Sequence, residues 1–350
     1  MSRNDDDFGL LRHLDDLLGE LHDSVPKAIK EFDADGIHDA RVATRRLKAA
    51  IGLLEPVLSS SRRKAFENVL KKLRRRLGPL RDLDVMIENL AKLQSKPAQA
   101  VASGWLRERL EKRREDARAC MNDKSGSADT LAKLGAWWHV REEIEEAREA
   151  ADTLLGQSLH LQLDAFAERA AGVVRQLAAR EAEEEPAERH DPHELRIAGK
   201  LLRYTLECAQ SQGHDLPSGV LRDFKQMQEA LGNWHDDVVL MQQAMQVSLD
   251  EMLALHDPAM QEKVLDLGRF LLRLSVRELA NFARLWAKRG EAVSRTIRER
   301  FPLTAAPTPA EAQAPVPVET VIEPETGPGP VGSDGRSAPE ERPPDVASGV

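Results

Sequence analysis

One pattern of charged residues occurs twice in this chain of 350 residues, and its spacing strongly constrains the fold. The first copy lies in the segment GIHDARVATRRLKAAIGLLEP and the second in DPHELRIAGKLLRYTLE. In both copies a His is followed at three, seven and ten positions by Lys or Arg. Subtracting 155 maps the second set onto the first: His193 onto His38, Arg196 onto Arg41, Lys200 onto Arg45, and Arg203 onto Lys48. The sequence therefore predicts a duplicated unit that keeps positive charge at a fixed spacing.

This spacing is that of one face of an α-helix. At about 100° per residue, the four side chains of each copy fall within an arc of roughly 80°. We call these four side chains the basic stripe of each helix. It is about 15 Å long, enough to span several phosphates. Apolar residues occupy the opposite side, so each helix should pack that side on a core. They are Ala43, Leu47, Ala50 and Leu54 in the first copy and Leu195, Ala198, Leu202 and Ala209 in the second.

The start of each predicted helix favours anions. Asp191 is a candidate N-cap, and Pro192 suits the first helical position ahead of His193. Asp35-Gly36 offers a similar start ahead of His38. Unpaired backbone N–H groups and the partial positive charge of a helix N-terminus would help such a His bind a phosphate oxygen. A lone His at such a place more often caps or pads the helix end, but the repeat favours binding.

A second duplicated element follows each stripe. Its copies are KKLRRRLGPLRDLDV, residues 71–85, and KQMQEALGNWHDDVV, residues 225–239, related by an offset of 154. We expect Gly78 and Gly232 to end one helix, with the next helix starting at once in an antiparallel turn. Asp82 and Asp236 would cap the following helix or hold an Arg in place, both structural roles.

Composition indicates an all-α protein. Aromatic residues make up only 4% of the chain, and Leu, Ala, Arg and Glu dominate long stretches. The expected helices span residues 8–32, 37–55, 62–77, 80–94, 98–121, 130–155, 157–183, 192–211, 217–231, 234–255 and 258–300, the last with a break.

The two ends of the chain and its cysteines give information on the cellular compartment of the protein. Cys120 and Cys208 have no disulfide or ligand spacing, which fits a reducing cytoplasm. The first residues are polar and acidic, and no apolar run approaches the length of a membrane span. We therefore expect a soluble, cytoplasmic protein. Residues 304–350 hold ten of the 19 prolines and eight acidic residues, which predicts a disordered acidic tail.

The chain resembles the CHAD family, the conserved histidine α-helical domain. The resemblance runs from about residue 8 to about residue 303 and rests on both stripes, Arg46, Tyr204, and the motifs LGPLRDLDV and LGNWHDD. It implies two pseudo-symmetric antiparallel helical bundles, residues 8–155 and 156–303, around a basic central channel or groove. It further implies binding of inorganic polyphosphate and association with polyphosphate granules, with no established catalytic activity. We expect no enzyme activity, cofactor or metal. No sign of an accompanying triphosphate-processing domain is present.

The candidate ligands for polyphosphate are basic, apart from one Tyr. Individual assignments within Arg74, Arg75 and Arg76 stay open, because runs of charge are often solvated. The full set is His38, Arg41, Arg45, Arg46, Lys48, Lys71, Arg74, Arg75, Arg81, His193, Arg196, Lys200, Arg203, Tyr204 and Lys225.

The net charge of −9 does not exclude an anionic ligand, because the charge is unevenly distributed. The tail carries −6 (eight acidic, two basic), which leaves −3 for residues 1–303. Residues 37–81 carry thirteen basic and three acidic residues, a net of +10. The second half is weaker, since residues 191–225 hold five basic and five acidic residues. We expect the first half to contribute more of the binding energy.

Two other functions compete with this interpretation. The dipeptides His38-Asp39 and His235-Asp236 raise the possibility of a metal-dependent phosphohydrolase. However, Asp39 becomes Glu194 in the second copy, His235 corresponds to Arg81, and no ligand set with metal spacing emerges. Nucleic-acid binding is the second alternative, but the stripes carry only Tyr204 as an aromatic residue for stacking. No sequence feature favours a nucleotide-binding or His-phosphotransfer protein. The sequence does not predict the oligomeric state.

Overall fold

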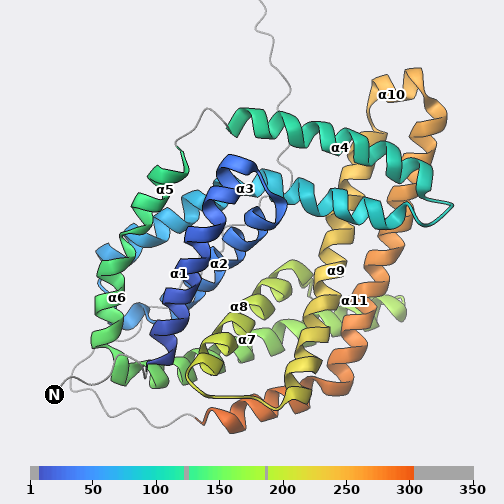
Figure 1. Cartoon of the computed structure of the whole chain (residues 1–350). Coiled ribbons are helices and arrows are strands. Elements are labelled where there is room, and N and C mark those ends of the chain that lie inside the picture. The colour runs from blue at the N-terminus through green and yellow to red at the C-terminus, as the bar shows by residue number, and fades with distance from the viewer. Residues whose placement is uncertain (1–7, 122–125, 186–187, 303–350) are drawn as a thin grey trace, which may run out of the picture. The chain divides into compact units, whose positions relative to one another are not determined.

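The computed structural model describes residues 8–121, 126–185 and 188–302. Helices and loops make up all of this described part, with no strand in it, so the predicted all-α class is confirmed (Figure 1). The described residues fall within one unit, residues 1–307. The predicted tail, residues 304–350, lies outside them. None of the described helices is long and apolar enough to cross a membrane.

Most of the described chain lies in long helices. A short 3-10 turn, Glu55–Val57, precedes the longest helix of the first half. The helices are α1 (Gly9–Pro26), the π-helical turn η2 (Lys27–Glu31), α2 (Ala34–Leu53), α3 (Ser60–Leu93), α4 (Ala100–Met121), α5 (Ser127–Leu134), α6 (Trp137–Glu146), α7 (Arg148–Glu181), α8 (Pro192–Ser211), α9 (Ser218–Ser248), α10 (Glu251–His256) and α11 (Pro258–Arg300).

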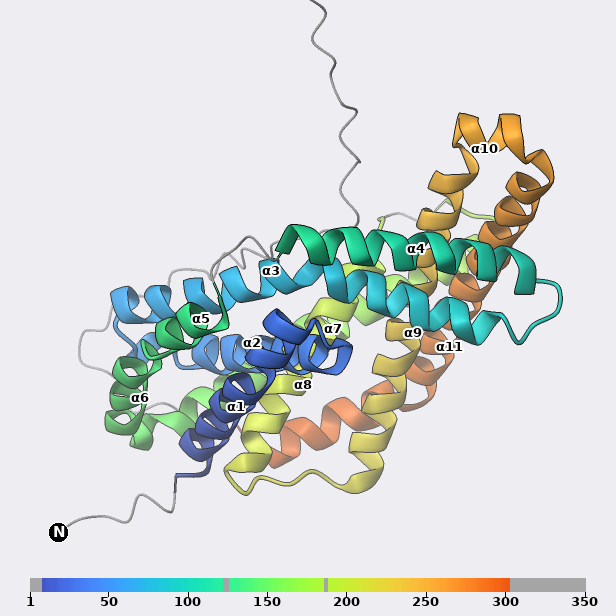
Figure 2. The same ribbon diagram turned by 45° about the horizontal axis from the view of Figure 1, so that its top comes forward.

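Helices pack in neighbouring pairs. Both ribbon views show α3 beside α4 and α9 beside α11, with α10 at the far end of the latter pair (Figures 1 and 2). Helix α1 packs on α2, and α7 packs on α8. Helix α2 also packs on α8 and on α3. The two helices that carry the basic stripes are therefore direct neighbours.

Two clusters of buried side chains hold the helices together. The larger cluster takes in α1, α2, α6, α7, α8, the first part of α3 and α9, and the last part of α11. The smaller one joins the later part of α3 and α9 with α4 and the early part of α11. Each cluster draws on both halves of the sequence, so the core does not divide near residue 155. The two-bundle arrangement and the duplication stay predictions.

The predicted helix ends at Gly78 and Gly232 are wrong. Helix α3 runs unbroken through Gly78 and Pro79, and α9 runs unbroken through Gly232. The buried side of α3 continues past this point, with Leu77 and Leu80 in the larger cluster and Leu83 in the smaller one. Burial of a continuous apolar face therefore outweighs the local tendency of Gly-Pro to end a helix.

Other boundaries also differ from the predicted ones. The expected helix 130–155 is divided into α5, α6 and the start of α7, whereas α11 is continuous. Helix α10 is separate from α9. The cap of α2 is Asp33, whose carboxylate accepts a hydrogen bond from the Gly36 N–H at 2.7 Å, in place of the expected Asp35. Phe32, with a φ of 55°, turns the chain into this cap.

Candidate functional site

The stripe helices α2 and α8 are matched in length, but α2 begins three residues earlier relative to its stripe, so His38 is its fifth residue and His193 the second residue of α8. Each has 20 residues, and their first residues are 158 positions apart, 34 and 192. The predicted cap of α8 is confirmed: the Asp191 carboxylate accepts a hydrogen bond from the His193 N–H at 2.8 Å, with Pro192 as the first helical residue. The apolar sides are buried as predicted, apart from Ala198, which is half-buried.

The stripe residues of α2 differ in exposure. His38 and Lys48 are exposed, Arg45 and the neighbouring Arg46 are half-buried, and Arg41 is buried. On α8 the four stripe residues are half-buried, while Tyr204 is buried. The Arg203 guanidinium lies over the Tyr204 ring, 5.2 Å from its centroid. Because most stripe residues are at least half-buried, the stripes contact neighbouring helices and are only partly exposed to solvent.

Arg41 bonds to the neighbouring helix α3. Its Nη1 donates a hydrogen bond to the Arg74 carbonyl oxygen at 2.9 Å. Its Nη2 lies 3.9 Å from an Asp82 carboxylate oxygen, which matches the predicted role of Asp82 in holding an Arg. A proline inside a helix weakens the backbone bonding of the preceding turn. Arg41 bonds in that turn to the Arg74 carbonyl, one residue before Arg75, whose carbonyl Pro79 leaves without its helical partner.

The two basic helices meet at Glu207 on α8. Arg46 on α2 forms an ion pair with Glu207, with 2.8 Å between Nε and Oε2. Arg203 on α8 reaches the Oε1 atom of the same carboxylate at 3.3 Å. Candidate ligands from both copies of the repeat are thus brought to one point, where a carboxylate balances part of their charge.

His38 lies within electrostatic reach of cations from two helices. Partial desolvation, followed by the positive charge of Arg81 and then Arg45, lowers the pKa of His38 below its ordinary value of 6.5, although Asp39 and Asp35 oppose this. His38 and Arg81 in turn help to lower the pKa of Glu88, mainly set by its hydrogen bond with Lys92. Cations and carboxylates from the start of α2 and the middle of α3 therefore act on one another.

The second copy brings together two histidines. The ring centroids of His193 on α8 and His235 on α9 are 5.2 Å apart. The Trp234 ring lies 6.2 Å from His235. His235 in the second copy occupies the position that corresponds to Arg81 in the first. In both copies, the His of the stripe therefore lies near this equivalent position, which is Arg81 on α3 in the first copy and His235 on α9 in the second.

The remaining candidates lie on α3 and α9. Lys71 and Arg74 are half-buried and Arg75 is exposed. Desolvation lowers the pKa of Arg76 against the opposing effect of Asp129 on α5, so Arg76 faces that helix. Lys225 is 76% exposed and lies 3.8 Å from Glu229.

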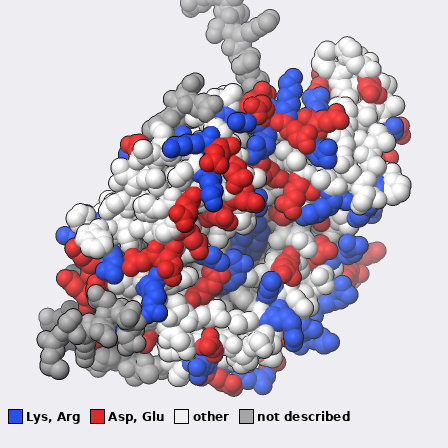
Figure 3. All heavy atoms as spheres, viewed as in Figure 1, with Lys and Arg blue, Asp and Glu red and all other residues white. Residues whose placement is uncertain are grey.

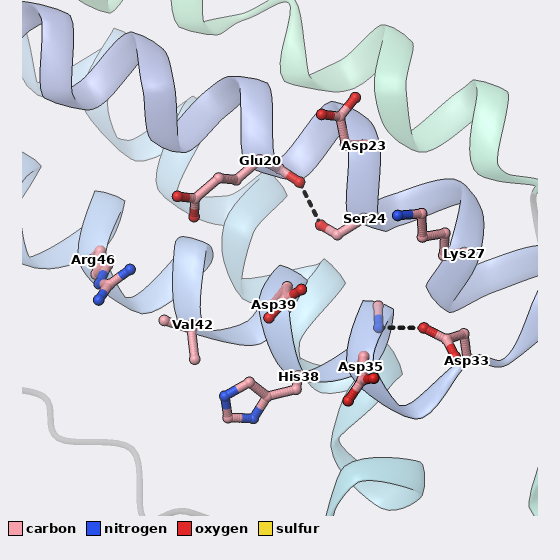
Figure 4. A pocket seen from close by; sticks show the side chains of 11 residues that line it. Glu20, Asp23, Ser24, Lys27, Asp33, Asp35, His38, Asp39, Val42 and Arg46 are labelled. Carbon is pink, nitrogen blue, oxygen red and sulfur yellow. Dashed lines mark hydrogen bonds between the residues drawn. The ribbon is translucent and has the colours of Figure 1, made fainter.

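A hollow of about 510 Å³ lies beside His38, between α1 and the start of α2 (Figure 4). The close view shows Glu20 and Asp23 on the α1 side and His38, Asp39 and Arg46 on the α2 side. Five of the eleven lining residues are acidic, so this hollow is not the basic groove that the resemblance implies.

Charge is unevenly spread over the surface. In the view of Figure 1, Lys and Arg atoms lie in a recess near the middle of the face, between α2, α8 and α9, and Asp and Glu side chains surround it (Figure 3). Within the described part of the chain, no group of three or more His, Cys, Asp or Glu residues is placed to hold a metal ion.

The comparisons with known proteins agree with this architecture. A family model described as the CHAD domain matches residues 10–245. The chain belongs to the CHAD family. It is similar to the crystal structure of the CHAD domain from the plant Ricinus communis, with 20% identity and a TM-score of 0.50 over 85% of this chain and 92% of that chain. At this identity the likeness shows a shared fold. No curated protein matches the sequence.

Sequence reasoning missed Glu207 and left His235 out of the site. Glu207 follows Arg203 by four positions, a spacing that indicates an ion pair within one helix. Its contact with Arg46 on another helix has no local signal. His235 could have been included, since the offset of 154 maps it onto the candidate Arg81.

Proposed function

We propose that this CHAD protein binds inorganic polyphosphate through the basic stripes of α2 and α8 and the adjoining parts of α3 and α9, without catalysis. The observation that carries the proposal is the meeting of Arg46 and Arg203 at Glu207. Two helices from separate copies of the repeat thereby present their cations to one place. A linear polyanion needs a continuous track of cations, and a lone stripe would supply only half of it.

The side chains suit phosphoryl oxygens. Arg offers a planar fork of donors, Lys a compact charge, and His a hydrogen bond at either protonation state. The N-terminus of α8 adds partial positive charge beside His193, whereas His38 lies one turn into α2. Family membership supports the same ligand, since the CHAD family is associated with polyphosphate. We further propose that the protein is cytoplasmic and associates with polyphosphate granules.

The absence of metal chemistry and of base recognition is also part of the proposal. Asp39 and His38 are neighbours on α2, but the described residues gather no further metal ligands around them. Tyr204, the aromatic residue of the stripes, is buried and therefore offers no open face for base stacking. We therefore expect no specific nucleic-acid partner.

Calorimetric titration with long-chain polyphosphate at low and high salt tests the proposal. Binding should weaken steeply with salt, because each neutralised phosphate releases counterions. The double variant Arg45→Glu with Lys200→Glu should lose binding. A matched control, Arg269→Glu with Arg295→Glu, makes the same change of charge on exposed positions of α11 and should bind as the wild type does.

Single-stranded DNA serves as competitor. If it displaces polyphosphate at equal concentration of phosphate, the protein is a general polyanion binder. A complete lack of binding at either salt, with both variants folded, would overturn the proposal. Circular dichroism and thermal unfolding establish that the variants are folded.

A further inference from the structure

The two copies of the repeat differ at one equivalent position. In the first copy, Arg81 lies close enough to His38 to lower its pKa. In the second copy, the corresponding residue is His235, and its ring lies against His193 with centroids 5.2 Å apart. Arg keeps its charge at all ordinary pH values, whereas His gains or loses a proton near neutral pH. One half of the site therefore has a fixed charge where the other half has a titratable one.

We propose that His235 is a phosphate-contacting residue and that the His193–His235 pair takes up a proton from the solvent when polyphosphate binds. This inference rests on the proposed function. It adds His235 to the residues that contact polyphosphate and proton uptake to the binding reaction. A neutral imidazole has one donor N–H, whereas a protonated one has two and a positive charge. Positive charges on two facing rings would repel each other. A phosphate placed between or beside them removes that repulsion.

The charged surroundings of the pair are mixed. Glu194, next to His193 on α8, pairs with Arg169 of α7 at 3.8 Å. On α9, Asp237 follows Asp236 and faces Glu278 and Arg277 of α11, with Lys96 from the segment after α3 also acting on it. From α2, Arg46 is already paired with Glu207. On α8 the stripe also carries Arg196, Lys200 and Arg203, and Asp191 caps the helix beside His193.

Carboxylates and cations both lie around the pair before the ligand arrives. Two of the nearby carboxylates have cationic neighbours of their own: Glu194 has Arg169, and Asp237 has Arg277 and Lys96. Asp236 directly follows His235, and the Asp191 carboxylate bonds to the His193 N–H. A polyphosphate chain would bring several negative charges at once to the pair. Because the buffer supplies the proton that the pair takes up, the measured enthalpy of binding should include the ionisation enthalpy of the buffer.

Proton uptake is measured by titrating the full chain with long-chain polyphosphate at about pH 7 in buffers of different ionisation enthalpy. The wild type should take up roughly half a proton or more per site. His235→Gln and His193→Gln should each lose most of this uptake and bind several-fold more weakly. The control is His256→Gln, an exposed His on α10 that bonds to its own helix at the Met252 carbonyl oxygen; it should match the wild type.

A gain-of-function variant separates charge from shape. His235→Arg copies the first half of the site, so polyphosphate binding should become tighter at about pH 8 and less dependent on pH. The ¹⁵N shifts of the imidazoles in the wild type, with and without polyphosphate, report protonation directly and need no variant. They keep the test valid if a substitution at position 235 prevents folding.

These experiments distinguish a failure of this inference from a failure of the proposed polyphosphate binding. Normal binding with unchanged proton uptake in His235→Gln overturns this inference and leaves polyphosphate binding intact. The same applies if His38→Gln, and not His235→Gln, removes the uptake. A wild type that does not bind polyphosphate overturns the proposed function itself.

Discussion

The guanidinium of Arg46 on α2 pairs with the carboxylate of Glu207 on α8, with 2.8 Å between Nε and Oε2. Arg203 shares this carboxylate from within α8. The side chains are only partly exposed, 28% for Arg46 and 22% for Glu207. A phosphoryl group that binds both arginines must therefore compete with a carboxylate already present. If polyphosphate binds here, Glu207 should weaken its binding.

Replacing this carboxylate should strengthen polyphosphate binding. Glu207→Gln removes the competing negative charge while keeping the size of the side chain. A partly exposed ion pair is worth about 1 kcal/mol, so the affinity should rise about fivefold at low salt. Calorimetric titration measures this directly. The melting temperature should fall, because Arg46 and Arg203 then lie close together without an anion.

The control for this substitution is Glu291→Gln. Glu291 is 88% exposed and pairs with Arg295 on the same helix α11, so its loss should leave affinity and stability unchanged. An unaltered affinity in Glu207→Gln would mean that the ligand does not reach Arg46 and Arg203 together.

The stripe helices show how much of this molecule the sequence alone predicts. The bounds of α8 agree with the predicted 192–211, because Asp191-Pro192 is a strong local start signal and the apolar period is regular. The stripes, the buried sides and the all-α class follow from the same periodicity. These features depend on residues within a few turns of one another.

Features that depend on distant residues were missed. Gly78-Pro79 carries a local signal to end a helix, yet the helix continues because Leu77 and Leu80 enter one core cluster and Leu83 the other. The Arg41 bond to the Arg74 carbonyl spans 33 positions and joins two helices. Neither the shared core nor this contact has a pattern in the local sequence, and the same holds for Arg46 with Glu207.

The two repeated glycines should respond differently to alanine. A methyl group at Gly232 would meet nothing within 4 Å. Gly232→Ala should therefore stabilise the protein by about 1 kcal/mol, because Ala favours a helix interior over Gly. At Gly78 the added Cβ would lie 3.1 Å from Arg41 Nη1, so displacement of Arg41 should offset the same gain. Urea unfolding of both variants measures the difference.

Each glycine variant acts as the control for the other. A loss of stability in Gly232→Ala would indicate that the chain leaves the helix at this point, contrary to the continuous α9. An equal gain in both variants would show that Arg41 moves without cost.

Asp237 should make the folded state less stable as pH rises. Burial, followed by the charges of Glu278 and Asp236, raises the pKa of Asp237 from 3.8 to about 6. Between these values the folded chain binds more protons at Asp237 than the unfolded chain does, so its contribution to the free energy of unfolding falls with increasing pH. Asp237→Asn should be more stable than the wild type above about pH 6, on the order of 1 kcal/mol after allowance for solvent screening.

Urea unfolding at several pH values tests this prediction. The difference between Asp237→Asn and the wild type should shrink as pH falls from about 6 and vanish below about 4. Asp266→Asn, at a 60% exposed position paired with Arg269, should show no such gain. A wild-type advantage at neutral pH would contradict the assigned direction of the pKa shift.

The two cysteines should differ sharply in reactivity. Cys120 is exposed, whereas Cys208 is 1% exposed. Burial, with a smaller contribution from the charge of Glu207, raises the pKa of the Cys208 thiol to about 12. Since the thiolate is the reactive form, iodoacetamide at about pH 8 should modify Cys120 in the native protein and Cys208 only in urea. Peptide mass spectrometry distinguishes the two sites, with Cys120→Ser as the control.

The same labelling reports on the packing between α2 and α8. Cys208 follows Glu207 directly, and desolvation is the leading cause of its pKa shift. Glu207→Gln should therefore leave Cys208 unmodified in the native state, even though a nearby negative charge is lost. Rapid labelling of Cys208 in this variant would mean that the ion pair with Arg46 holds α2 and α8 together. The expected gain in polyphosphate affinity would then have to be attributed to opening of the helices and not to removal of a competing carboxylate.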